Sequence, residues 1–210
     1  MTTPADLLAQ VAQDIRACTL CDLCQGARQG VPGTGPDQAN IMLIGEAPSQ
    51  FDDRRGYPFS GPSGDFLDEL LAAAGLQRSQ VYLTNLVKHR VPQSRPLTPD
   101  EISACAPYLT REIAAVNPIL IVTLGSGAIR RFLPKAKISQ LHGTHSLLQG
   151  RVVLAMYNPA AALHREELRE TVVHDFTYAL PAAFAEAQRL AAEGKLGGDD
   201  GGAPEQLTLF

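Results

Sequence analysis

The chain has 210 residues, of which 45% are hydrophobic, and a formal net charge of −4. This length fits one domain with a substantial core, and no apolar run is long enough to cross a membrane, so we expect no membrane partner. The charge argues against nucleic-acid binding through overall basicity, but it is uneven: residues 191–210 alone carry −3. The polar, acidic start MTTPADLLAQ does not resemble a signal peptide, and we therefore expect a cytoplasmic protein.

Hydrophobic patterning predicts alternating helices and strands along the chain. Four short apolar runs predict strands buried on both faces, at 41–44, 81–85, 119–124 and 152–157. Helices are predicted at 4–17, after an N-cap at Ser63, at 99–116, at 126–133 and over much of 166–194, with a hairpin or bend at 142–150. This alternation is typical of an α/β fold with a parallel sheet of four strands in a single domain, residues 1–194. Residues 195–210 form a Gly-rich acidic tail.

The stretch from 41 to 71 indicates a ligand pocket. Its strand ends at Gly45, and the polar loop Glu46–Arg55 therefore begins at the carboxyl end of a strand, where open α/β sheets bind ligands. The loop closes with a rigid Gly/Pro turn that carries Phe59. The alternative interpretation is an ordinary strand-to-helix connection with a long loop, and this stretch alone does not separate the two.

Four cysteines suggest a metal centre. Cys18, Cys21 and Cys24 have C-x2-C-x2-C spacing, and Cys105 lies far along in a predicted helix. A cytosolic chain does not keep structural disulfides, and such thiolates bind zinc or an iron–sulfur cluster. Spacing does not choose between the two metals, and free buried thiols are the alternative.

Four stretches together resemble the uracil-DNA glycosylase superfamily, and within it the iron–sulfur family 4 enzymes. They are Gly45–Pro48; Gly56–Gly64; Thr84–Lys88 with Arg95, Pro96, Glu101 and Cys105; and Tyr157–Ala160. The resemblance implies a sheet ordered 2-1-3-4, a site at the carboxyl ends of the strands and a 4Fe–4S cluster. It implies a monofunctional DNA-repair enzyme that flips uracil from single- or double-stranded DNA, hydrolyses its N-glycosidic bond and leaves an abasic site. We expect a monomer associated with the bacterial nucleoid.

The residues at these motifs suit base excision. Phe59 offers a face on which a flipped base can stack, and the Asn85 amide can accept from uracil N3–H and donate to O4, which cytosine would mismatch. A carboxylate at Glu46 or Asp52 could orient water, and backbone N–H groups around Ala47 could stabilise the departing anion. The family usually has His before the last Pro, as the donor to uracil O2, where this chain has Asn158, so its rate or substrate preference could differ.

The resemblance also places a cluster ligand after Lys88, where this chain has His89 instead of the usual Cys. A neutral imidazole can replace a thiolate, so we expect Cys18, Cys21, Cys105 and His89 to hold the cluster. Cys24 is the alternative fourth ligand. His89 could instead be a basic residue that faces phosphate.

Three functions compete at this point. An active glycosylase accounts for all four motifs. A DNA-binding protein of the same fold that has lost catalysis is the alternative suggested by Asn158. A redox-sensing metalloprotein would need only the cysteines and would leave Phe59 and Asn85 without a role.

The loop after the last strand is a candidate DNA contact. Leu163 could fill the gap that a flipped base leaves, with His164 and Arg165 on phosphates. Leu163 could equally begin the apolar face of the next helix.

The last six residues suggest a protein partner. The sequence Glu-Gln-Leu-Thr-Leu-Phe follows the Gly-rich linker and resembles the peptide by which bacterial repair proteins dock on the DNA sliding clamp. Hydrogen bonds from Gln206 would fix its register, and Leu207, Leu209 and Phe210 would fill apolar pockets. The alternative is that the segment covers a groove of its own domain.

Overall fold

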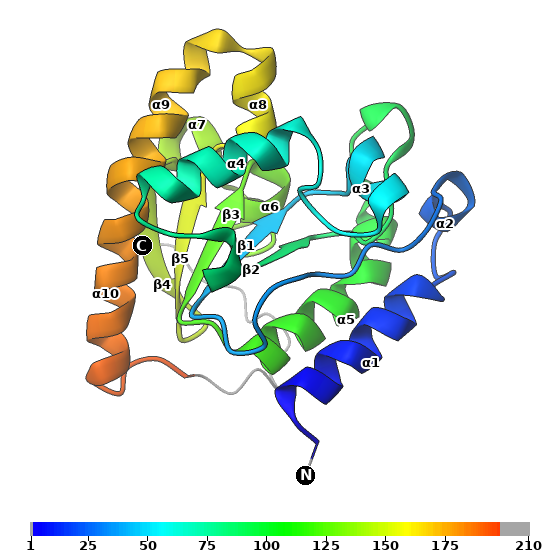
Figure 1. The fold of residues 1–210 in the computed structure, drawn as a ribbon, viewed down its shortest axis with the longest axis horizontal. Helices are drawn as coiled ribbons and strands as arrows, with labels where there is room; N and C mark the ends of the chain where they lie inside the picture. Colours follow the sequence, from blue (N-terminus) through cyan, green and yellow to red (C-terminus); the bar gives the residue numbers. More distant parts are fainter. Residues whose placement is uncertain (1, 198–210) are drawn as a thin grey trace.

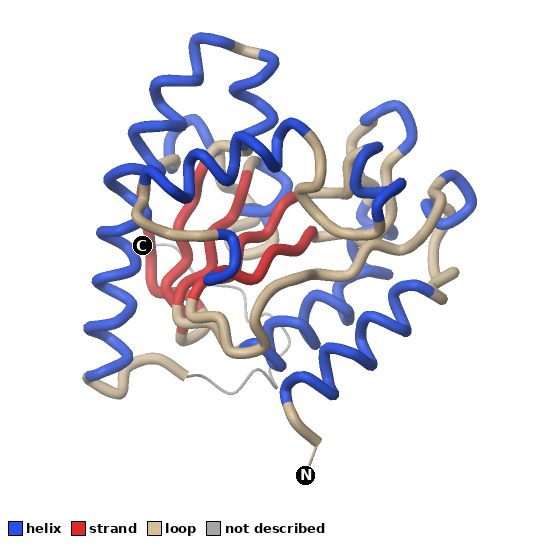
Figure 2. The backbone as a smooth tube through the Cα atoms, in the orientation of Figure 1, coloured by secondary structure: helices blue, strands red, loops and turns tan. Residues whose placement is uncertain are grey.

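A computed structural model describes residues 2–197 and shows one mixed sheet between layers of helices (Figures 1 and 2). The strands have the order β2-β1-β3-β5-β4, and all neighbours are parallel except β4 and β5. Their bounds are β1 Ile41–Gly45, β2 Val81–Asn85, β3 Leu120–Leu124, β4 Thr144–Leu148 and β5 Arg151–Met156. The expected order of the four parallel strands is confirmed, and the sheet has one strand more than the sequence predicted.

The extra strand, β4, lies in the segment expected to be a hairpin or bend. It pairs antiparallel with β5 at the sheet edge, and its residues are exposed except for the half-buried Leu148. An exposed edge strand lacks the continuous apolar run that marks a buried one, which explains why the pattern did not reveal it.

Helices cover both faces of the sheet. On one face, α4, α8, α9 and α10 pack on strand residues such as Leu43, Leu83 and Val122. On the other, α5 and α6 pack on Met42, Ile121 and their neighbours. The helix α1 lies beside α5 and extends this second layer (Figure 1). The helix bounds are α1 Pro4–Arg16, α2 Leu23–Gly26, α3 Gln50–Arg55, α4 Pro62–Ala73, α5 Pro99–Val116, α6 Ser126–Arg130, α7 Ile138–Leu141, α8 Pro159–His164, α9 Arg169–His174 and α10 Leu180–Ala192.

Two helix predictions need correction. The N-cap of α4 is Gly61, with Pro62 at the first helical position, and not Ser63. The helix expected over 166–194 begins with a 3-10 turn, η3 (Glu166–Leu168), and α9 is separated from α10 by a π-helical stretch, η4 (Asp175–Ala179). Pro181 explains the interruption, because it lacks the N–H that would bond to the carbonyl of residue 177.

Candidate functional site

Asn85 and Phe59 converge above Gly45 at the carboxyl ends of β1 and β2. Gly45 pairs with Asn85 across the two strands. A Cβ atom on Gly45 would lie 2.3 Å from Asn85 Oδ1 and 2.8 Å from Phe59 Cζ, so glycine is needed for both side chains to reach this place. Both side chains are buried, and Asn85 Nδ2 has no hydrogen-bond partner. A buried amide donor without a partner marks a place where a polar ligand could bind.

The turn that carries Phe59 is held by a carboxylate. Phe59 has φ 52°, a left-handed conformation that a residue with a Cβ rarely adopts. The next residue, Ser60, donates from its N–H and its hydroxyl to Asp52 Oδ1, at 2.7 and 2.8 Å. Asp52 Oδ2 accepts from the N–H of Ser49 at 2.8 Å, which completes a capping box at the start of α3. These bonds use both oxygens of a buried carboxylate, so Asp52 holds the loop in shape, and its role in orienting water stays a prediction.

The second carboxylate expected at the site, Glu46, lies over α6. A Cβ on Gly127 would come within 2.4 Å of Glu46 Cδ and Oε2, so the Glu46 carboxylate rests on the first turn of that helix. Glu46 and the adjacent Ala47 are half-buried, and the carbonyl of Glu46 accepts from Val87 N–H at 3.2 Å. Glu46 is therefore the carboxylate that remains partly open to solvent at the end of β1.

Asn158 lies close to the end of β3 and caps α8. Its Oδ1 accepts from Ala160 N–H at 2.9 Å, and its Nδ2 is 3.5 Å from the carbonyl of Leu124, at the long limit of a hydrogen bond. A Cβ on Gly125 would lie 3.4 Å from Asn158 Cβ, so the two residues are in close contact. The Asn158 amide oxygen therefore accepts a hydrogen bond as the cap of α8, whereas the amide nitrogen makes only a long, weak hydrogen bond.

The DNA-facing residues expected after β5 are at the surface. Leu163, His164 and Arg165 are all exposed, Leu163 by 43%. Leu163 lies in the short helix α8, and its exposure leaves the side chain accessible for the expected DNA contact.

Three of the four cysteines cluster in a small apolar core between α1 and α5. Cys18 and Cys105 are buried, and Cys21 packs against the same cluster. Burial raises the pKa of the Cys105 thiol to about 11 despite a hydrogen bond from Lys88 N–H, and nearby Cys21 and Cys18 raise it further. Burial is also the main cause that raises the pKa of Cys21. Without a cation the raised pKa values keep the Cys21 and Cys105 thiols protonated and unreactive at neutral pH.

His89 is buried beside this region, and its Nδ1 has no hydrogen-bond partner. Burial lowers its pKa, which favours the neutral imidazole. Among residues 2–197, no three His, Cys, Asp or Glu side chains are arranged to hold a single metal ion. The thiols and the orphaned nitrogen nevertheless suit a cluster, whose ligands stand further apart than those of one ion.

The segment after β2 is buried, which argues against the alternative interpretation of His89 as a basic residue that faces phosphate. Lys88 is fully buried, and its ammonium bonds to Glu112, Thr84 Oγ1 and the carbonyl of Asn85. Arg90 pairs with Asp53 at 3.2 Å. These residues brace the pocket from behind, and neither Lys88 nor His89 is exposed to meet phosphate. The only sequence signal was that Lys88 lies three residues after Asn85, the last residue of β2.

Fold and site together define an α/β protein with an aromatic and amide pocket at the carboxyl ends of its parallel strands. The model of the uracil DNA glycosylase superfamily matches residues 32–180, and the chain belongs to this superfamily. It is 38% identical over 180 residues to the type-4 uracil-DNA glycosylase of Archaeoglobus fulgidus, covering 80% of this chain and 89% of the relative. The type-4 enzyme of Thermotoga maritima is 35% identical over 180 residues, with coverage of 83% and 94%. The resemblance drawn from the four motifs is thereby confirmed. No helix within residues 2–197 has the length and apolar character needed to span a membrane.

Proposed function

We propose that this protein is a uracil-DNA glycosylase that hydrolyses the N-glycosidic bond of a flipped uracil nucleotide in DNA and leaves an abasic site. Its type-4 relatives carry this activity in their names. The observation that carries the proposal is the convergence of Asn85 and Phe59 over Gly45, with one amide donor left unpaired in a buried position.

The pocket recognises uracil through stacking on the face of the base and through hydrogen bonds to its edge. Phe59 stacks on the base. Asn85 Nδ2 donates to uracil O4, and Oδ1 accepts from N3–H; cytosine presents a donor and an acceptor at these places and mismatches both. Mispaired polar groups in a closed site cost about 1–3 kcal/mol each, enough for strong discrimination.

Bond cleavage is assigned to the groups around β1 and β5. As the glycosidic bond breaks, positive charge develops on the sugar and negative charge on the base. Glu46 orients the attacking water and stabilises the cation, while backbone N–H groups near Ala47 and the Asn158 amide face the uracil anion. Asn158 already caps α8, and this commitment favours the second candidate, a uracil-DNA-binding protein with little catalysis.

A 4Fe–4S cluster is the cofactor we assign to the cysteine core. Cys18, Cys21 and Cys105 would hold it, with His89 as the fourth ligand and Cys24 as the alternative. The apolar surroundings and the orphaned His89 nitrogen support this assignment. When bound, the cluster supplies cross-links between the N-terminal segment, the loop after β2 and α5.

The assay that tests the function is release of free uracil from single-stranded, U·A and U·G oligonucleotides by the iron-loaded protein. We expect release without added divalent metal. Asn85→Ala should abolish most of it, and Asn85→Asp should impair it and relax discrimination against cytosine, because a carboxylate cannot donate. Asn40→Ala removes an exposed amide at the opposite end of β1 and serves as the matched control. Tight binding to uracil-containing DNA without release would instead support the second candidate.

The proposed clamp-binding peptide lies outside the described residues 2–197. We keep the sliding clamp as a proposed partner in the bacterial cytoplasm, on the strength of Gln206, Leu207, Leu209 and Phe210. A titration of purified clamp with the full chain and with a chain ending at Pro204 tests it. Binding by the full chain alone supports the proposal, and equal binding by both contradicts it.

A further inference from the structure

Arg78 holds the backbone of the turn that presents Phe59. Its Nη2 donates to the carbonyls of Pro58 and Phe59, at 2.8 and 2.9 Å, and its Nη1 bonds to Asp68 on α4 at 3.1 Å. Two successive carbonyls can face one nitrogen only if the backbone between them is folded, since an extended chain points them to opposite sides. The guanidinium therefore recognises the left-handed conformation that Phe59 adopts.

This conformation needs such support because the residue is not glycine. A left-handed Phe59 brings its Cβ close to its own carbonyl, and strain of this kind persists only where the surroundings hold it. On the other side of the turn, the Phe59 carbonyl lies where a Cβ on Gly64 would stand, at 1.8 Å. Helix α4 thus presses the turn from one side, and Arg78 binds it from the other.

Arg78 also lies on the same short segment as the base-reading amide. It opens the 3-10 turn η1 (Arg78–Gln80), which leads directly into β2, and β2 ends at Asn85. One end of this segment therefore fixes the turn of Phe59, and the other presents Asn85. The relative position of the stacking face and the hydrogen-bonding edge is set by one strand buried along its whole length.

We propose that Arg78 is a positioning residue that locks Phe59 in its left-handed, base-stacking conformation and thereby sets the affinity for the flipped uracil. The inference rests on the proposed function, and it adds a specificity-determining residue that lies outside the pocket. Arg78 reaches neither the base nor the sugar in this scheme, because Nη2 is bound to the two carbonyls of the turn and Nη1 to Asp68.

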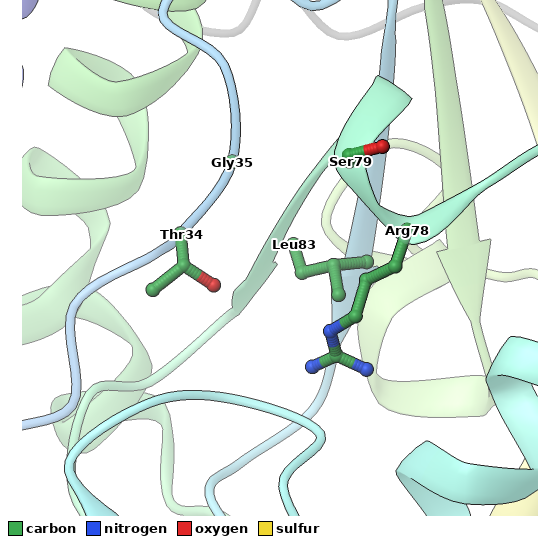
Figure 3. Close-up of a pocket in the computed structure, with 5 residues that line it drawn as sticks. All are labelled: Thr34, Gly35, Arg78, Ser79 and Leu83. Carbon is green, nitrogen blue, oxygen red and sulfur yellow. The ribbon is translucent and has the colours of Figure 1, made fainter.

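A cavity beside Arg78 makes a chemical test possible. It has a volume of about 390 Å³ and is lined by Thr34, Gly35, Arg78, Ser79 and Leu83 (Figure 3). In Figure 3 the Arg78 side chain extends away from η1, with its guanidinium pointing toward the neighbouring loop. In Arg78→Ala the lost group is equivalent to N-ethylguanidinium, which could enter through this open space.

The experiment measures binding of iron-loaded protein to two DNAs, one with uncleavable 2′-fluoro-2′-deoxyuridine and one with an abasic site. Stacking on an aromatic side chain contributes about 1–3 kcal/mol per base, which corresponds to about tenfold in affinity or more. We therefore expect Arg78→Ala to bind the uracil DNA about tenfold more weakly and the abasic DNA about as well as wild type. N-ethylguanidinium should restore uracil binding, ethylammonium should not, and Arg78→Lys should lie between Arg78→Ala and wild type.

Two further variants separate positioning from general destabilisation. Asp68→Asn removes the ion pair of Arg78 but leaves its carbonyl contacts, so uracil binding should stay near the wild-type value. Adding Arg78→Ala to Phe59→Ala should cause little further loss, because the position of an absent ring cannot matter. Equal weakening for both DNAs, or full additivity with Phe59→Ala, would overturn the proposal. A wild-type chain with no preference for uracil DNA would overturn the proposed function together with this role.

Discussion

Lys88 and Glu112 form an ion pair of 2.6 Å in which neither side chain is more than 1% exposed. The pair joins the segment after β2 to the C-terminal half of α5. Lys88 also donates to the carbonyl of Asn85 at 2.7 Å, and Glu112 Oε1 accepts from the N–H of Gly33 at 2.8 Å. Charges interact more strongly in the protein interior than in water. This buried pair therefore holds the main chain of Asn85 from behind the pocket.

Breaking this pair on one side should be more harmful than removing both charges. Glu112→Leu leaves the Lys88 ammonium buried without its counter-ion, and we expect a loss of about 3–5 kcal/mol in the free energy of unfolding. Lys88→Met combined with Glu112→Leu should recover a large part of this loss, although Asn85 and Gly33 lose bonds. Urea denaturation measures both, and Glu186→Ala, which breaks an exposed ion pair with Arg189, should leave the midpoint nearly unchanged. A double variant less stable than Glu112→Leu would contradict this account.

Asn158 caps α8 and, in the proposed function, donates to uracil O2, and substitutions can separate these two roles. Asn158→Asp keeps an oxygen to cap Ala160 N–H but removes the donor for uracil O2, so it should lower kcat with little change in thermal stability. Asn158→Ala should lower activity and also weaken the cap. Asn158→His should retain or raise activity, since an imidazole can donate. Uracil-release kinetics and melting temperatures of the three variants check this prediction, and full activity in Asn158→Asp would place the donor elsewhere.

The fourth ligand of the proposed cluster can be identified by iron content. Purified protein should be brown, absorb broadly in the visible blue and contain iron rather than zinc. Cys24→Ser should keep its iron, whereas His89→Ala should lose part or all of it. The reverse pattern would assign Cys24 as the ligand. Cys105→Ser, which removes a thiol common to both assignments, is the positive control for loss.

Acid should weaken the start of α5 through Glu101. Two bonds from Arg95, with help from Thr98, lower the pKa of Glu101 from its usual 4.5 to about 2. A carboxyl whose pKa is lower in the folded state stabilises the fold fully above its unfolded pKa, and this contribution disappears as pH falls toward the folded value. Glu101→Gln should therefore be less stable than wild type at pH 7, and the difference should shrink between about pH 4.5 and pH 2. Urea titrations across this range measure it, and a difference independent of pH would show that the carboxylate charge is irrelevant.

Sequence patterns predicted the parallel part of the fold because buried strands are uniformly apolar. They did not show β4, whose residues face solvent, and the helix predicted over 166–194 overlooked the interruption before Pro181. Boundaries elsewhere differ by one to three residues, as at β3, which begins at Leu120.

The residues of the pocket could be predicted from the sequence only where the residue type itself indicates a chemical role. Phe59 and Asn85 were found because a ring and an amide suit a base, and the structure brings them together over Gly45. The burial of Lys88 and Asp52 was not visible in the sequence, because a charged residue in a loop looks solvent-exposed until the fold supplies its buried partners. Arg78 carried no signal in the sequence, since its contacts are to backbone carbonyls.

Leu163 is the side chain we expect to replace the flipped base in the duplex. It is 43% exposed on α8, next to His164 and Arg165, so it covers little of the core. Unstacking a base costs a few kcal/mol, and an inserted apolar side chain offsets part of this cost only where a stack exists. Leu163→Ala should therefore reduce excision from duplex DNA about tenfold and leave excision from single strands nearly unchanged. Leu147→Ala, which truncates a leucine on β4 that is 51% exposed, should affect neither substrate. Rates for both substrates, with melting temperatures for both variants, give the answer: equal loss on duplex and single strands, accompanied by lower stability, would mean that Leu163 is not inserted into the stack.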